Sequence, residues 1–188
     1  MKITQEFEVA RPIAVVWDFF QDVPSVAQCL PGAELTEDKG DGVFAGKISV
    51  KLGPMTAAFE GEATVTPDAA MNSGHIEGKG VDRRGGSRGQ VKVDYRLVDA
   101  AGGTSVAVDA DVTLSGSAAQ FGRTGLINEM SSRLIGEFVT CLEAKLEATT
   151  EAEANTITAG EVSGFSLFLS SLLTRIGDFF KKLLGPRS

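Results

Sequence analysis

The stretch AAQFGRTGLINEMSSRLIGEFVTCLEAKL, residues 118–146, carries the longest helical pattern in the chain. Its apolar side chains recur at spacings of three and four residues, at Ile127, Met130, Leu134, Phe138, Leu142 and Leu146. That spacing places them on one stripe of an α-helix. The stretch therefore predicts a helix about 29 residues long, whose apolar side needs an apolar surface to lie on.

The residues before this helix supply such a surface, because their apolar side chains alternate with polar ones, as in strands with one buried face. Alternation predicts strands within 44–52, 55–65 and 89–98, and a weaker, glycine-rich strand over 73–81. The clearest strand is 106–114, and the pair Gly102-Gly103 before it predicts a hairpin. We therefore expect about six antiparallel strands in this part of the chain.

The N-terminal part adds a strand over residues 2–9 and two short helices. Pro12 predicts the start of the first helix, and the second, over 25–29, ends at Pro31-Gly32. The predicted fold is α+β of the helix-grip type, a curved antiparallel sheet wrapped around a long helix. We divide the chain into a domain over 1–146, a flexible acidic linker over 147–163, and an amphipathic helix over 164–188.

A sheet bent around one helix leaves space if the inward side chains are small, and many of them are glycine or alanine. We therefore expect an apolar cavity for a ligand. Its predicted lining is Trp17, Phe20, Phe44, Phe59, Tyr95, Phe121, Met130, Leu134 and Phe138. The alternative is that these side chains form an ordinary packed core.

The charges are unevenly distributed along the chain. Residues 1–146 have a net charge of −6, residues 147–163 of −4 and residues 164–188 of +3. The acidic body argues against nucleic acid as a partner, because phosphate binding needs clustered Lys and Arg. Cys29 and Cys141 form no CxxC pair, so we expect buried free thiols in a reducing compartment. The N-terminus has no apolar signal region, which favours a cytoplasmic location.

The C-terminal segment 164–188 predicts an amphipathic helix. Its apolar face consists of Phe165, Phe168, Leu169, Leu172, Ile176, Phe179, Phe180 and Leu183. Lys181 and Lys182 lie beside that face, which suits a helix in the headgroup layer of an anionic membrane. Its uncharged run is too short to span a bilayer. Two alternatives are that the helix covers an apolar patch of its own domain or pairs with another chain.

Residues for catalysis or metal binding are scarce. His75 is the only histidine and falls on the polar side of a weak strand, where a structural role is expected. One histidine and two distant cysteines predict no metal site. Residues 78–83, GKGVDR, lack the third glycine of a dinucleotide fingerprint and are interpreted as a hairpin. Arg83, Arg84 and Arg88 lie in a glycine-rich loop that is either a solvated turn or a docking patch for acidic groups.

Several motifs resemble one known family in order and spacing. ARPIAVVWDFFQDV (10–23) and CLPGAEL (29–35) resemble the opening of START-like, polyketide-cyclase-type proteins. Together with KLGPMTAAFEGEATV (51–65), GHIEGKG (74–80), GQVKVDYRL (89–97) and LSGSAAQFGRTGLI (114–127), they are similar to the CoxG family of carbon monoxide dehydrogenase subunits. The resemblance covers residues 1 to about 146.

The resemblance implies a helix-grip domain with a hydrophobic cavity, no redox cofactor of its own and a service role to a molybdenum-containing dehydrogenase or related hydroxylase. It also implies a peripheral location at the cytoplasmic face of the cell membrane. Because electrons from such an enzyme pass to the respiratory chain, we expect the cavity ligand to be a quinone, menaquinone or ubiquinone.

The sequence thus predicts a non-enzymatic membrane adaptor that recruits the dehydrogenase and binds a quinone. One rival is a START-like cyclase or hydrolase acting on a hydrophobic substrate, which would need a buried acid or base, and the predicted lining offers only Tyr95. The other rival is a lipid-transfer protein with no dehydrogenase partner.

Overall fold

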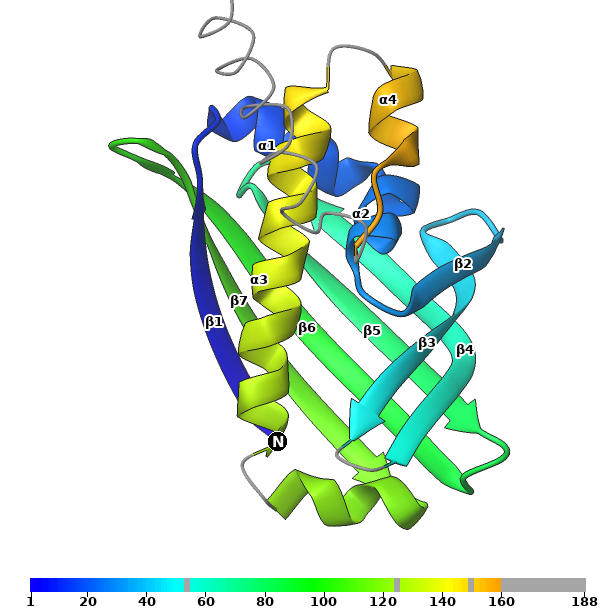
Figure 1. Ribbon diagram of the computed structural model, residues 1–188. Coiled ribbons are helices and arrows are strands. Elements are labelled where there is room, and N and C mark those ends of the chain that lie inside the picture. The colour runs from blue at the N-terminus through cyan, green and yellow to red at the C-terminus, as the bar shows by residue number, and fades with distance from the viewer. Residues whose placement is uncertain (53–54, 124–125, 149–150, 160–188) are drawn as a thin grey trace, which may run out of the picture.

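Seven antiparallel strands form one curved sheet in the computed structural model, which describes residues 1–52, 55–123, 126–148 and 151–159 (Figure 1). The strands are β1 Lys2–Val9, β2 Ala33–Asp38, β3 Val43–Leu52, β4 Met55–Asp68, β5 Ser73–Asp82, β6 Ser87–Ala100 and β7 Gly103–Ser115. From β2 to β7 each strand pairs with the next, and β1 pairs with β7, so the sheet order is β1-β7-β6-β5-β4-β3-β2.

The helices cover one face and one end of this sheet (Figure 1). They are α1 Ile13–Gln21, α2 Val23–Cys29, the 3-10 helix η1 Gly116–Arg123, α3 Leu126–Glu147 and α4 Glu151–Thr156. The long helix α3 crosses the face of the sheet, while α1 and α2 stand at one end, as expected for short helices that close a curved sheet. The predicted helix-grip architecture is confirmed.

The apolar interior is divided into two clusters. The larger lies beneath α1, α2 and the second half of α3, and includes Val16, Leu97, Val106 and Leu142. The smaller joins Ala57, Phe59 and Ala118 with partly buried side chains that include Leu114 and Met130. The two clusters lie toward opposite ends of the sheet, so the space between them is not filled by one continuous core.

The long helix is shorter than its apolar pattern predicts. Residues 118–123 belong to η1, and α3 begins at Leu126. The sequence has glycines at 122 and 125, and glycine is among the poorest helix formers. Side-chain hydrogen bonds compete with helix continuation as well: the Ala118 amide donates to Ser87 Oγ at 3.0 Å, and Ser117 Oγ donates to the Gly85 carbonyl at 2.5 Å.

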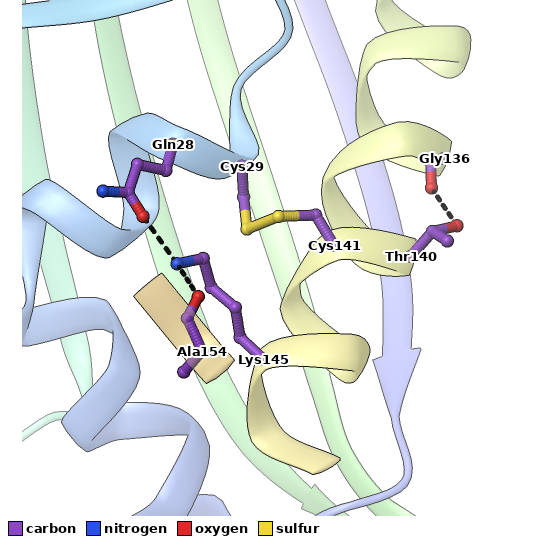
Figure 2. Close-up of a disulfide and its surroundings, with 7 residues drawn as sticks. All are labelled: Gln28, Cys29, Gly136, Thr140, Cys141, Lys145 and Ala154. Atoms are coloured by element: carbon purple, nitrogen blue, oxygen red, sulfur yellow. Dashed lines mark hydrogen bonds between the residues drawn. A yellow bond between two sulfur atoms is a disulfide. The ribbon is translucent and has the colours of Figure 1, made fainter. Parts of the chain in front are cut away.

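The prediction of two free thiols is wrong, because Cys29 and Cys141 form a disulfide (Figure 2). Both cysteines are fully buried, and the bond joins α2 to α3 across 112 residues of sequence. Spacing along the chain could not reveal the pair, because only the packing of α2 against α3 brings the sulfur atoms together. Cysteine usage therefore gives no support to a reducing compartment.

The first part of the predicted flexible linker is ordered as α4 and packs on the domain. Figure 2 shows the Lys145 side chain donating to Gln28 Oε1 at 2.6 Å and to the Ala154 carbonyl at 2.8 Å. Ile157 packs against the larger core cluster, and the Ala159 amide donates to the Gln28 carbonyl at 2.9 Å. Small, polar composition predicts a coil here because it does not reveal this anchoring by α2 and α3. Residues 160–188, with the predicted membrane-binding side chains, lie outside the described residues.

Candidate functional site

An apolar groove with a volume of about 530 Å³ lies between α3 and the inner face of the sheet. Its floor comes mainly from β3 to β6, one wall from Met130, Ser131 and Leu134 of α3, and one end from α1 and α2. In Figure 1, α3 runs in front of β1, β7 and β6 and leaves β3 to β5 uncovered on this face. The groove therefore occupies the side of the sheet that the helix does not cover.

Small residues account for the empty space. Gly46, Gly61, Ala63, Gly78 and Gly80 all contribute to the floor. Gly61 pairs with Gly46 on one side and with Gly80 on the other, so three adjacent strands lack a side chain at the same level. The sequence predicts such a hollow from the many small inward residues, and the structure has one at this place.

The nine predicted lining residues separate into three groups. Six of them line the groove: Phe20, Phe44, Phe59, Tyr95, Met130 and Leu134. Trp17 and Phe138 pack in the larger core cluster instead. Phe121 lies in η1, and the structure does not describe its side chain. A ligand-binding role for any of them stays a prediction.

Sequence reasoning missed the contribution of α2. Val23, Val26, Ala27 and the following Leu30 all line the groove. In α2 the apolar residues Val23, Val26 and Ala27 recur at i, i+3 and i+4, which is the signal that could have identified this inward side. Such a pattern is weak in a helix of only seven residues, because so few positions do not establish a period.

Tyr95 is the buried polar residue of the groove, with a relative exposure of 5%. Burial raises the pKa of its phenol, and the neighbouring Gln21 side chain lowers it by a smaller amount. The two side chains nevertheless do not meet the geometry of a hydrogen bond, and Tyr95 Oη has no partner among the described residues. At neutral pH the phenol is therefore protonated and free to donate.

His75 lies on the outer face of the sheet, away from the groove. Its Nδ1 is 2.7 Å from Asp94 Oδ1 and its Nε2 is 3.4 Å from Glu77 Oε1. Hydrogen bonds to these carboxylates raise its pKa. Among the residues that the structure describes, no group of three or more His, Cys, Asp or Glu side chains could hold a metal ion.

The three arginines of the predicted docking patch are exposed near the hairpin between β5 and β6. The buried Asp82 carboxylate organises this turn by accepting from the amides of Arg84, at 3.0 Å, and Gly85, at 2.8 Å. Arg83 and Arg84 occupy the turn and Arg88 begins the next strand. Their side chains are thus available to an acidic partner, although Gly78 to Asp82 of the predicted hairpin belong to β5.

The described helices do not include a membrane span. Over residues 1–52, 55–123, 126–148 and 151–159, no helix has both the length and the apolar content needed to cross a membrane.

Comparisons with known proteins agree with the fold. The family model for the carbon monoxide dehydrogenase subunit CoxG matches residues 6–147. A conserved protein from Geobacillus kaustophilus is similar in structure, with a TM-score of 0.66, 13% identity and coverage of 78% of this chain and 95% of that one. Protein Ms6760 from Mycobacterium smegmatis has a TM-score of 0.55 and 16% identity, with coverage of 79% and 92%. No curated protein sequence matches the chain.

Proposed function

The chain belongs to the CoxG family of carbon monoxide dehydrogenase subunits, and we propose that it is a non-enzymatic accessory protein that binds a quinone in its groove. In this role it recruits a molybdenum-containing carbon monoxide dehydrogenase, or a related hydroxylase, to the cytoplasmic face of the cell membrane. The bound quinone receives electrons from that enzyme and carries them to the respiratory chain.

The observation that supports quinone binding is the groove itself. Its volume of about 530 Å³ falls within the range of small-molecule pockets. Along β6 it extends from Tyr95 to Gly89, six residues that span roughly 20 Å in a strand. A long apolar floor suits a ligand with a flat ring and an isoprenoid chain, because burying such a chain removes apolar surface from water.

The path of the chain supports a membrane near this groove. Ala159 is hydrogen-bonded to Gln28 of α2, and α2 also lines the groove. Only four residues separate Ala159 from the amphipathic segment that begins at Gly164. A membrane bound by residues 164–188 would therefore lie within short reach of the α2 end of the groove, where a lipid-soluble quinone could enter.

Quinone binding can be tested by filling the groove. Ala63 faces into it, whereas the next residue of β4, Thr64, is exposed on the opposite face. We expect Ala63→Phe to weaken binding of a short-chain naphthoquinone by at least about tenfold and Thr64→Phe to leave it unchanged. Trp17 is the only tryptophan, so quenching of its fluorescence reports the bound quinone in both variants.

Equal affinity of the parent and Ala63→Phe proteins would refute binding in the groove. Mass spectrometry of an organic extract of the purified protein identifies the natural ligand. A quinone supports the proposal, whereas a phospholipid or fatty acid favours lipid transfer, and turnover of an added polyketide would indicate an enzyme.

A further inference from the structure

Tyr95 Oη is a buried hydroxyl whose hydrogen-bonding capacity is unused within the described residues. A buried polar group without a partner is unfavourable, because the group has lost its hydrogen bonds to water and gained none. Most such groups in folded proteins bond to the protein or to an ordered molecule. The unused hydroxyl therefore points to a partner that binds in the groove.

The phenol ring is held in place by the elements around it. Tyr95 pairs with Gly74 across β5 and β6, and a Cβ at position 74 would overlap the ring and hydroxyl of Tyr95. On the other side, the ring centroid of Phe20 lies 5.2 Å from that of Tyr95. Gly74 thus leaves the room that the ring occupies, and Phe20 of α1 packs against it.

Along β6, the groove changes from one polar group to a purely apolar surface. Tyr95 lies at the end near α1, while Val91 and Gly89 of the same strand line the groove farther along. Beyond them the lining continues with Leu114 and Met130. The site therefore fits a molecule with a polar atom at one end and an apolar chain.

The charges favour a neutral polar atom over an anionic headgroup. The two lysines among the lining residues, Lys47 and Lys79, belong to the outward-facing series of their strands. Lys47 Nζ is also paired with Glu34 Oε2 at 2.8 Å. Neither side chain is placed to neutralise a carboxylate or phosphate beside Tyr95.

We propose that the Tyr95 hydroxyl hydrogen-bonds to a neutral oxygen of the ligand, so that the head of the ligand lies beneath α1 and its apolar chain runs along β6 toward Leu114 and Met130. This inference rests on the proposed function for the choice of a quinone. A phenol donates to a quinone carbonyl and accepts from a quinol hydroxyl. The same subsite therefore serves both redox states of the carrier.

The test compares the parent protein with Tyr95→Phe and uses two pairs of probes. Each pair joins a carbonyl compound to its hydrocarbon counterpart: a short-chain naphthoquinone with the naphthalene bearing the same chain, and a long-chain ketone with the matching alkane. Displacement of a fluorescent apolar dye gives the affinities. We expect Tyr95→Phe to weaken binding of each carbonyl compound by about five- to tenfold and to leave both hydrocarbons unchanged.

Thermal unfolding without ligand separates this role from a structural one. Removing a hydroxyl that has no partner in the protein should leave the melting temperature of Tyr95→Phe equal to or above that of the parent. A lower melting temperature with unchanged carbonyl affinities would show that the hydroxyl serves folding, and would overturn the proposal.

The probes also distinguish the two hypotheses. If the ketone binds in a Tyr95-dependent manner and the naphthoquinone does not bind, the quinone function fails and the hydrogen-bonding subsite stands. If the naphthoquinone binds equally well to parent and Tyr95→Phe, the quinone function stands and the subsite is refuted. Binding of neither carbonyl compound refutes both.

Discussion

His75 shows how cross-strand neighbours set the chemistry of a single residue. Asp94 on β6 and Glu77 on the same strand as His75 hold its ring between two carboxylates, and their hydrogen bonds raise its pKa above 6.5. The folded protein therefore binds this proton more tightly than the unfolded chain does. The resulting stabilisation is fully present below about pH 6.5 and is lost as the pH rises through the folded-state pKa.

Because His75 is the only histidine, its ring proton resonances can be assigned without ambiguity. We expect an NMR titration to give a pKa above 6.5, and Asp94→Asn to move that pKa downward because its hydrogen bond is the largest cause of the shift. Asp99→Asn, farther along β6, serves as the matched control and should leave the titration unchanged. The effect on stability should be small, since the His75 side chain is 38% exposed and solvent screens the pair. A pKa that Asp94→Asn does not change would contradict this assignment.

Among the elements, α2 depends most on covalent and polar anchoring. It has only seven residues, yet it forms one end of the groove. The disulfide ties Cys29 to α3, and Lys145 of α3 reaches Gln28 and the carbonyl of Ala154 in α4 (Figure 2). These contacts hold α2, α3 and α4 together at the end of the sheet where the described chain finishes.

The disulfide should therefore contribute to both stability and ligand binding. It closes a long loop, and removing such a bond typically costs about 2–4 kcal/mol of unfolding free energy. We expect a dithiol reductant to lower the melting temperature of the parent and to weaken naphthoquinone binding, because α2 is then released from α3. The Cys29→Ser/Cys141→Ser variant should melt at the temperature of the reduced parent and show no response to reductant.

Counting the free thiols of protein blocked at the moment of cell lysis determines whether the bond forms in cells. Identical melting curves with and without reductant, for a parent protein with no free thiols before treatment, would contradict a stabilising role.

The tail is the element whose interpretation depends most on the sequence. Residues 164–188 carry a net charge of +3, against −6 for residues 1–146, so the tail and not the body suits an anionic surface. We expect deletion of residues 164–188 to move the protein from the pellet to the supernatant when it is sedimented with anionic vesicles. A milder variant, Lys181→Glu/Lys182→Glu, should reduce binding to anionic vesicles more than to neutral ones. Unchanged sedimentation of the deletion variant would refute the anchor.

At the scale of the whole molecule, the two candidate interaction regions lie at opposite ends of the sheet. In Figure 1 the helices α1, α2 and α4 stand at the top, and the hairpin between β5 and β6 lies at the lower right near η1. The tail follows the described chain at the α2 end. If that end faces the membrane, the exposed arginines of the hairpin point away from the bilayer, where a soluble dehydrogenase could reach them.

Charge reversal tests this arrangement. We expect Arg83→Glu/Arg84→Glu to weaken binding of the partner dehydrogenase by about tenfold at low salt and less at high salt, because exposed charges are screened. Arg96→Glu, exposed on the outer face of β6, is the matched control and should bind like the parent. Vesicle sedimentation of the double variant should be unchanged. Equal affinity of parent and double variant would exclude the hairpin as the docking site.

The sequence by itself determined the elements of this protein, because residue periodicity reports directly which face of a strand or helix is apolar. The alternation in 106–114 corresponds to β7, and residues 2–9 form β1 as expected. Small inward residues such as Gly61 and Gly80 also indicated the groove, since side-chain volume is a local property.

Only the tertiary structure decided the features that depend on contacts between distant residues. The bond between Cys29 and Cys141, the docking of α4 through Lys145, and the placement of Trp17 and Phe138 in the core all arise from packing across the fold. The unpartnered Tyr95 hydroxyl belongs to the same class, because hydrogen-bond satisfaction depends on every group around an atom and not on its position along a strand.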